Sequence, residues 1–380
     1  MPSYSGVWTL QAQMQAEAAG NWPKPPVGLF SWGQNNLGQL GLNNLVYYSS
    51  PVQVGALSTW SQIATGLAHT VATKTDGTLW SWGKNTPQGQ LGLNDTVNRS
   101  SPVQIGALTT WYQVAAGSNH SLAIKTDGTL WSWGYNSSGP LGLGNTVYRS
   151  SPVQVGALTT WYQVAAGITF TIAIKTDGTL WSWGKNPYGQ LGLNDTANRS
   201  SPVQVGALTT WSKIAAGGYQ TFAIKTDGTL WSWGFNNYGQ LGLNIASGNR
   251  SSPVQVGLLT TWSQIAGGQI HTLATKTDGT LWSWGYNSSG RLGLGDTDRR
   301  SSPVQVGALT AWSQVAGGES SSFSIKTDGT FWSWGNNGSG RLGINLYSGN
   351  RSSPVQVGSL TTWLRLPKMP MTPFSVAIKG

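Results

Sequence analysis

Three histidines, His69, His120 and His271, are the side chains of this sequence best suited to acid–base or metal chemistry near neutral pH. They occupy one position of a sequence unit that repeats along the chain, and other units fill that position with Phe170 or Gln220. Side chains that recur once per unit are spread around the molecule, whereas a zinc site needs three or four ligands about 2 Å from one ion. We therefore predict that the histidines are structural, with no metal site and no catalytic triad.

Carboxylates, the other candidates for acid–base catalysis, are scarce. The chain has 12 Asp and Glu residues, and six of them are the Asp of a recurring Lys-Thr-Asp-Gly segment, as in Lys175 and Asp177. Too few remain for the pair of carboxyl groups that glycoside hydrolysis requires. Cysteine is absent from the sequence, which excludes thiol nucleophiles, thiolate metal sites and disulfides. We expect no enzymatic activity and no cofactor.

One arginine per unit supplies much of the formal net charge of +10, because each Lys-Thr-Asp-Gly segment is internally neutral. Equal placement in successive units arranges these arginines as a ring on one face or rim. Two interpretations stay open: the ring binds phosphates or an acidic partner, or each arginine donates to carbonyls of its own loop. The second is favoured, so nucleic acid is not an expected partner. The six residues are Arg99, Arg149, Arg199, Arg250, Arg300 and Arg351.

The repeat that positions these residues is marked by the tripeptide Ser-Trp-Gly, which occurs seven times at intervals of 50 or 51 residues. A period near 50 is typical of the blades of a β-propeller. The 22 Trp and 52 Gly fit an all-β fold in which Gly forms turns and regularly placed Trp packs between blades. The Trp residues of the tripeptides are Trp32, Trp82, Trp133, Trp183, Trp233, Trp284 and Trp334.

Each unit contains four predicted strands. Polar and apolar residues alternate, which is the pattern of a half-buried strand. A Pro opens one strand, where its missing N–H does least harm, and an Asp-Gly turn joins each unit to the next. The run Ala-Ala-Gly assigns another strand to the crowded axis, where only small side chains fit. In the unit that begins at Gly128 the strands are predicted at residues 129–133, 152–155, 161–167 and 171–175.

The seventh unit is divided between the two ends of the sequence. Residues 377–380 belong to one of its strands and residues 29–32 to another. We predict that these ends pair, which would close the ring without a covalent bond and remove exposed sheet edges. The predicted fold is all-β: a seven-bladed β-propeller of four-stranded blades over residues 27–380, closed by pairing of the N- and C-terminal strands, with a short N-terminal helical leader.

The unit resembles the repeat of the regulator of chromosome condensation family, and the resemblance covers all seven units. It implies a seven-bladed propeller but no single function, because one fold hosts many activities. The even spacing leaves no room for the inserted wedge by which nucleotide-exchange members act on a small GTPase. Binding through the loops of one face, as in members that inhibit β-lactamases, stays open. The matching segments are residues 115–121, 130–134, 189–193 and 198–203.

Variation between the units is concentrated in three loops, which follow Trp-Gly, follow Ala-Gly and precede the arginine. A rigid frame with differing loops is the usual construction of a binding surface, and Tyr and Asn are common contact residues of recognition loops. The alternative is neutral drift after duplication. The candidate recognition residues are Tyr135, Tyr148, Tyr188, Tyr219, Phe235, Tyr238 and Tyr286.

Residues 1–26 fall outside the repeat. Residues 10–19 are rich in helix formers and predict a short helix, and the Pro-rich residues 22–26 predict an extended connector. Residues 5–23 resemble the short N-terminal segment of virion proteins in marine tailed phages, which implies docking on a phage particle. The alternative is a leader that folds back on its own propeller or stays disordered. The residues available for docking are Val7, Trp8, Leu10, Met14 and Trp22.

These features favour a non-enzymatic phage virion protein, associated with the tail or capsid, that docks on other virion proteins and presents its propeller to a host-surface glycan or protein. Residues 1–20 lack the basic and apolar regions of a secretory signal, so we expect synthesis in the host cytoplasm and location on the virion. The alternative is a free-standing interaction module, an inhibitor or scaffold. A basic DNA- or chromatin-binding propeller is the third candidate.

Overall fold

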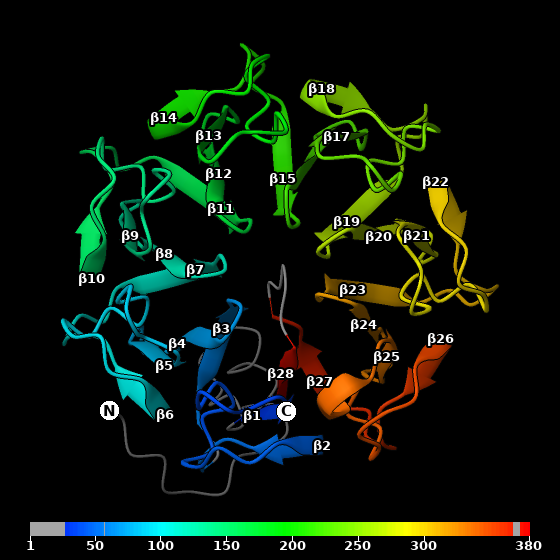
Figure 1. Ribbon diagram of the computed structural model, residues 1–380, viewed down its shortest axis with the longest axis horizontal. Helices are drawn as coiled ribbons and strands as arrows, with labels where there is room; N and C mark the ends of the chain where they lie inside the picture. The colour runs from blue at the N-terminus through cyan, green and yellow to red at the C-terminus, as the bar shows by residue number, and fades with distance from the viewer. Residues whose placement is uncertain (1–26, 57, 368–372) are drawn as a thin grey trace, which may run out of the picture.

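Seven four-stranded antiparallel sheets surround a central axis in the computed structural model, which describes residues 27–56, 58–367 and 373–380 (Figure 1). Each sheet is one blade, and the blades follow one another around the axis in chain order. The predicted seven-bladed propeller of four-stranded blades is therefore confirmed.

The strands of each blade take four positions from the axis outward. The inner strands are β3 (Trp60–Thr65), β7 (Trp111–Ala116), β11 (Trp161–Ala166), β15 (Trp211–Ala216), β19 (Trp262–Gly267), β23 (Trp312–Gly317) and β27 (Trp363–Arg365). The second strands are β4 (His69–Lys74), β8 (His120–Lys125), β12 (Phe170–Lys175), β16 (Gln220–Lys225), β20 (His271–Lys276), β24 (Ser321–Lys326) and β28 (Phe374–Lys379). The third strands are β1 (Gly28–Gly33), β5 (Leu79–Gly83), β9 (Leu130–Gly134), β13 (Leu180–Gly184), β17 (Leu230–Gly234), β21 (Leu281–Gly285) and β25 (Phe331–Gly335). The outer strands are β2 (Tyr48–Gln53), β6 (Arg99–Gln104), β10 (Arg149–Gln154), β14 (Arg199–Gln204), β18 (Arg250–Gln255), β22 (Arg300–Gln305) and β26 (Arg351–Gln356).

Chain direction sorts the connections onto two faces of the disc. Neighbouring strands are antiparallel, so successive connections alternate between the faces. The loop between inner and second strands and the long loop between third and outer strands share one face, which we call the loop face. The Thr-Asp-Gly turns and the linkers between blades share the opposite face, which we call the turn face. All three variable loops predicted from the sequence therefore lie on the loop face.

The seventh blade combines strands from both ends of the described chain. Strand β1 pairs with β28 in antiparallel register, from Gly28 opposite Lys379 to Gly33 opposite Phe374. Strand β2 flanks β1, and β27 flanks β28 on the side of the axis. The predicted pairing of the chain ends is confirmed, and main-chain hydrogen bonds join the first and last parts of the ring.

One backbone carbonyl in each blade accepts two hydrogen bonds from the next blade. The carbonyl of Pro140 accepts from Trp183 Nε1 at 2.9 Å and from Thr171 Oγ1 at 2.8 Å. Trp183 and its six equivalents are fully buried, and all seven make this indole bond at 2.9–3.0 Å. We call the seven acceptors the linking carbonyls. They belong to Gln39, Gln90, Pro140, Gln190, Gln240, Arg291 and Arg341.

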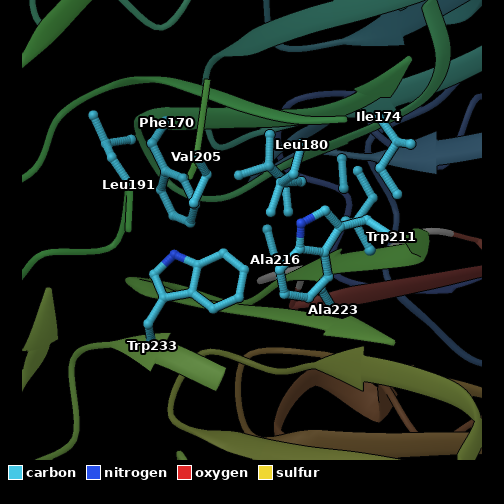
Figure 2. Close-up of a cluster of buried hydrophobic side chains, with 12 residues drawn as sticks. Phe170, Ile174, Leu180, Leu191, Val205, Trp211, Ala216, Ala223 and Trp233 are labelled. Carbon is cyan, nitrogen blue, oxygen red and sulfur yellow. The ribbon is translucent and has the colours of Figure 1, made fainter. Parts of the chain in front are cut away.

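The apolar core lies between neighbouring blades. Figure 2 shows Phe170 and Leu180 of one blade facing Trp211 and Trp233 of the next, and all four side chains are buried. Gly192 lies against this core at a φ of +73°, and a Cβ atom there would be 2.7 Å from Trp233 Nε1. Glycine is required at this position because both the backbone conformation and the indole exclude a side chain.

The Lys-Thr-Asp-Gly turns are part of the frame. Asp177 Oδ1 accepts from the N–H and the hydroxyl of Thr179 at 2.9 and 2.6 Å, and that hydroxyl accepts from Trp181 Nε1. Lys175 Nζ lies 3.6 Å from the centroid of the Trp181 ring and 5.2 Å from that of Trp161, which is cation–π geometry. Cation–π contacts of the same kind recur at all six turns.

The predicted fold class is wrong in one part, the helical leader. Within the described residues the only helical element is a three-residue 3-10 turn, η1 (Gly338–Gly340), and the fold is all-β. Residues 1–26 lie outside that part of the chain. No helix of the described residues is long and apolar enough to cross a membrane. The predicted docking residues that fall outside the described chain are Val7, Trp8, Leu10, Met14 and Trp22.

We expect Trp183→Ala to lower the free energy of unfolding by about 3–5 kcal/mol, because it empties a buried site and removes one donor from the Pro140 carbonyl. Urea denaturation followed by circular dichroism measures the change. Tyr162→Ala is the control, since this ring is 57% exposed near the turn face, and it should cost less than about 0.5 kcal/mol. Equal losses for the two variants would contradict the assigned role of the indole.

Candidate recognition face

A buried asparagine fixes the long loop of each blade. Asn186 Nδ2 donates to the carbonyl of Asp195 at 3.0 Å, and its Oδ1 accepts from the N–H of Leu191 at 2.9 Å. All seven equivalents are fully buried and make both bonds. The residue was not predicted from the sequence, although Trp-Gly-x-Asn recurs in every unit. The seven are Asn35, Asn85, Asn136, Asn186, Asn236, Asn287 and Asn337.

Five aromatic side chains on the loop face form a continuous series of ring contacts. Tyr219 contacts Tyr188 at a centroid distance of 5.3 Å, and Tyr188 contacts Phe235 at 4.8 Å. Phe235 contacts Tyr238 at 6.2 Å, and Tyr238 contacts Tyr286 at 4.8 Å. All five are half-buried. We call this series the aromatic arc, and each member is among the recognition residues predicted from the sequence.

The arc crosses three adjacent blades because long loops meet the loops of their neighbours. Tyr188 lies between β13 and β14, Tyr219 lies between β15 and β16, and Tyr286 lies between β21 and β22. Two guanidinium groups lie beside the rings: Arg291 is 5.0 Å from the centroid of Tyr286, and Arg299 is 6.0 Å from that of Tyr238. The arc therefore combines aromatic surface with positive charge.

The other two predicted recognition residues, Tyr135 and Tyr148, form a separate pair. Their ring centroids are 5.3 Å apart, and the Tyr148 hydroxyl lies 2.7 Å from Ser137 Oγ. Burial raises the pKa of the Tyr219 hydroxyl, and the neighbouring phenols of Tyr188 and Tyr135 raise it further.

The predicted ring of six arginines is present at the loop-face ends of the outer strands. Every member donates to a carbonyl one or two residues before it, as Arg199 does to Ala197 at 3.1 Å. This supports the interpretation in which the arginines hold their own loops. Three of the six also pair with the Asp four residues earlier, and within the described residues the other three have no carboxylate partner. The paired residues are Arg99, Arg199 and Arg300, and the others are Arg149, Arg250 and Arg351.

Charge is distributed unequally between the two faces. The described loops and strand ends of the loop face carry eleven cationic and five acidic residues, whereas the turn face carries seven lysines and six aspartates. The loop face therefore has a surplus of six positive charges and the turn face a surplus of one. The loop-face residues are Lys84, Arg99, Arg149, Lys185, Arg199, Arg250, Arg291, Arg299, Arg300, Arg341, Arg351, Asp95, Asp195, Asp296, Asp298 and Glu319.

The three histidines connect neighbouring blades and have a structural role, as predicted. His69 Nε2 lies 2.9 Å from Ser121 Oγ, and Ser121 donates its proton to the linking carbonyl of Gln90 at 2.8 Å. The serine hydroxyl must therefore accept from His69, which places a proton on Nε2. His120 and His271 lie 3.3 and 2.9 Å from the equivalent hydroxyls.

Protonation of these imidazoles is unfavourable in the folded protein. Burial lowers the pKa of His69 and of His120 to about 3, and it lowers the pKa of His271 well below its ordinary value. All three Nδ1 atoms are buried without a hydrogen-bond partner among the described residues, so a second proton would find no acceptor there. The folded state keeps the histidines neutral through the physiological range.

The axial channel is a concave site with a volume of about 250 Å³. Alanine of the inner strands is the commonest residue of its wall, consistent with the small side chains predicted near the axis. Its polar groups bond neighbouring blades: Gln163 Oε1 accepts from the N–H of Ile214 at 3.2 Å, and Lys213 Nζ donates to the carbonyl of Ser263 at 2.5 Å. No group of three or more His, Asp or Glu side chains in the described chain is placed to hold a metal ion. We therefore take the aromatic arc as the candidate site.

Comparison with known proteins gives one family over almost the whole propeller. The RCC1-like domain family matches residues 28–369. The structure of Prp20p from Saccharomyces cerevisiae, described with its binding to Gsp1p and histones, covers 94% of this chain and 92% of its own at 23% identity and a TM-score of 0.82. Human WBSCR16 covers 93% of this chain and 99% of its own at 22% identity and a TM-score of 0.83. These structures show the shared fold.

Similar sequences occur as short matches within other proteins. The ultraviolet-B receptor UVR8 of Arabidopsis thaliana is 37% identical over 115 residues, which is 29% of this chain and 26% of the receptor. The human X-linked retinitis pigmentosa GTPase regulator is 40% identical over 116 residues, which is 29% of this chain and 11% of the regulator. The human probable E3 ubiquitin-protein ligase HERC6 is 37% identical over 117 residues, 11% of its length. The matches thus span about a quarter or less of each relative.

We expect the free energy of unfolding to fall between pH 7 and pH 5. Histidines of the unfolded chain, with a pKa near 6.5, become protonated over this range, whereas the buried histidines of the folded protein stay neutral. The loss is about 2 kcal/mol for each of His69, His120 and His271 at pH 5. Urea denaturation at the two pH values measures it. The control is the triple His→Gln variant, since Gln220 already occupies the equivalent position. A variant with an unchanged pH dependence would contradict the assignment.

Proposed function

This chain belongs to the RCC1-like domain family, and from that premise we propose that it is a non-enzymatic recognition module that binds its partner through the loop face. The observation that carries the proposal is the aromatic arc, since variable residues of three blades meet in one continuous contact series. A protein of similar fold, Prp20p, is described with its binding to Gsp1p and histones, which supports a binding role. We expect this chain to bind a different partner from Prp20p to the extent that their loop residues differ.

The proposal of a binding role also rests on how the titratable side chains are used. The histidines are buried and held neutral between blades. The turn aspartates bond their own turns, and three of the loop-face aspartates pair with arginines. These groups stabilise the frame, whereas the variable loop residues include many Tyr, Asn and Ser, which suit contacts with a partner.

We further propose that the chain is a phage virion protein, associated with the tail or capsid, that docks by residues 1–26 on other virion proteins. The likeness of residues 5–23 to the N-terminal segment of marine tailed-phage virion proteins supports this. The point of attachment supports it too: Val27 and Ser58 exchange backbone hydrogen bonds of 2.8 and 3.0 Å on the turn face. A leader that joins the propeller there, and anchors it to a particle, leaves the loop face outward.

A free-standing interaction module, an inhibitor or scaffold, is the second candidate, and the protein-binding relative Prp20p favours it. It uses the same loop face but needs no leader. A basic propeller that binds DNA or chromatin is the third, favoured by the loop-face charge surplus, and its affinity would fall steeply with salt because it would depend on released counterions.

We expect a chain that lacks residues 1–26 to fold normally but to be missing from purified virions, because the proposed docking segment is gone. Virions assembled with the full chain and with the truncated chain are compared by immunoblotting, and circular dichroism with urea denaturation checks the fold. Normal incorporation of the truncated chain would contradict docking by the leader and favour the free-standing module.

The loop-face part of the proposal has its own test. The double variant Tyr188→Ala with Tyr238→Ala should enter virions at the normal level but reduce retention of the virions on host cells by about tenfold or more. The control is Tyr112→Ala with Tyr162→Ala, which alters two rings, each 57% exposed, near the turn face. Loss of retention only in the control would reverse the assignment of the faces.

A further inference from the structure

The aromatic arc is an addition to the repeat rather than part of its frame. The positions of Tyr188 and Tyr238 are filled by Ser138, Ser289 and Ser339 in three other blades. The long loops of those blades, one of which also carries Tyr286 of the arc, keep the same buried asparagine bonds as the loops that carry Tyr188 and Tyr238. Because these bonds form with serine as well as with tyrosine, the frame does not require Tyr188 and Tyr238, and the two rings are free to serve a ligand.

The shape of the arc favours a long ligand. Its four ring contacts have centroid separations between 4.8 and 6.2 Å and follow one another across three blades. Successive rings are inclined to one another by 71°, 53°, 68° and 52°. The arc is therefore a track of rings that turn relative to one another, without two parallel faces in succession.

Positive charge accompanies the track. The guanidinium groups of Arg291 and Arg299 lie 5.0 and 6.0 Å from ring centroids of the arc. Burial lowers the pKa of Arg291 to about 10, so this group stays charged at neutral pH. The carboxylate of Glu319 pairs with Arg341 at 3.0 Å. The whole loop face carries a positive surplus, which favours an anionic ligand over a neutral one.

We propose that the aromatic arc binds an anionic polysaccharide, with the C–H faces of successive sugars against the rings and the carboxylates of the polysaccharide near the exposed guanidinium of Arg299, while the buried charge of Arg291 adds to the positive field. The inference rests on the proposed recognition role of the loop face and names its ligand class. Aromatic faces carry partial negative charge, so they attract the polarised C–H groups of a sugar ring. Successive sugars of a polysaccharide turn relative to one another, as the rings of the arc do.

Single-stranded nucleic acid fits the same track less well. Its bases would need ring faces on which they can lie flat, because stacking supplies much of the affinity of such sites. The inclinations of 52–71° between neighbouring rings present edges as often as faces. Nucleic acid is therefore the rival ligand for the test and not the ligand that the geometry favours.

The test measures binding of the full chain to alginate, a polysaccharide of uronic acids, by isothermal titration calorimetry. Neutral dextran and oligothymidylate are measured in parallel. We expect binding to alginate, no binding to dextran and weaker binding to oligothymidylate. The double variant Tyr188→Ala with Tyr238→Ala should raise the Kd for alginate by about tenfold or more.

Two matched variants separate the contributions of charge and of the arc. Arg299→Gln should weaken binding to alginate about fivefold, by loss of one exposed charge beside the track. Tyr112→Ala with Tyr162→Ala removes two exposed rings near the turn face and should leave the Kd unchanged. Circular dichroism confirms that each variant is folded before its affinity is compared.

Each remaining result overturns the inference in a recognisable way. Tighter binding of oligothymidylate than of alginate, lost in the Tyr188 and Tyr238 variant, would assign the arc to nucleic acid. Alginate binding that the variant does not change would place the polysaccharide elsewhere. Absence of alginate binding, while the same variant still abolishes retention on host cells, would reject the polysaccharide and leave the proposed recognition role intact. Failure of both assays would reject the two together.

Discussion

The structure depends on the pair of hydrogen bonds that each linking carbonyl accepts from the next blade. The indole of a buried Trp and the hydroxyl of a Thr or Ser converge on one backbone oxygen, and the pattern repeats seven times around the ring. A buried indole N–H and a buried carbonyl would each be destabilising alone, so every blade needs its neighbour. Since the acceptor is main chain, Gln, Pro and Arg all occupy the position without loss of the bond.

The variability of the loop face follows from a similar division between a fixed frame and variable loop ends. Buried asparagines and linking carbonyls fix the long loops from below, while the ends of these loops are free to carry Tyr, Phe, Lys or Ser. Arginines at the rim reinforce the loops by bonding their carbonyls, and their charge still contributes to the field of the face. A family that shares this frame is thereby able to present different surfaces from one backbone.

Much of the fold could be predicted from the sequence because its signals are local and repeated. The Ser-Trp-Gly period indicated the number of blades. The divided seventh unit predicted the pairing of β1 with β28. The repeat position of His69 indicated a structural residue. The arc was predicted only as separate residues, because contacts such as Tyr188 with Phe235 join blades about 50 residues apart and depend on how blades pack. The Asp95–Arg99 pairing was visible at i,i+4 spacing but was not predicted, and the helical leader had no repeat to support it.

The pairing of β1 with β28 joins two segments of the described chain that are synthesised at different times. A ribosome synthesises residues 28–33 long before residues 374–379, so β1 and β2 emerge while the strands that complete their sheet do not yet exist. Until residues 374–379 have been synthesised, the nascent chain carries an unpaired edge on β1 and another on the blade that must meet it. Ring closure is therefore an event of very long sequence separation, and the open edges stay accessible to cellular chaperones until residues 374–379 pair with β1.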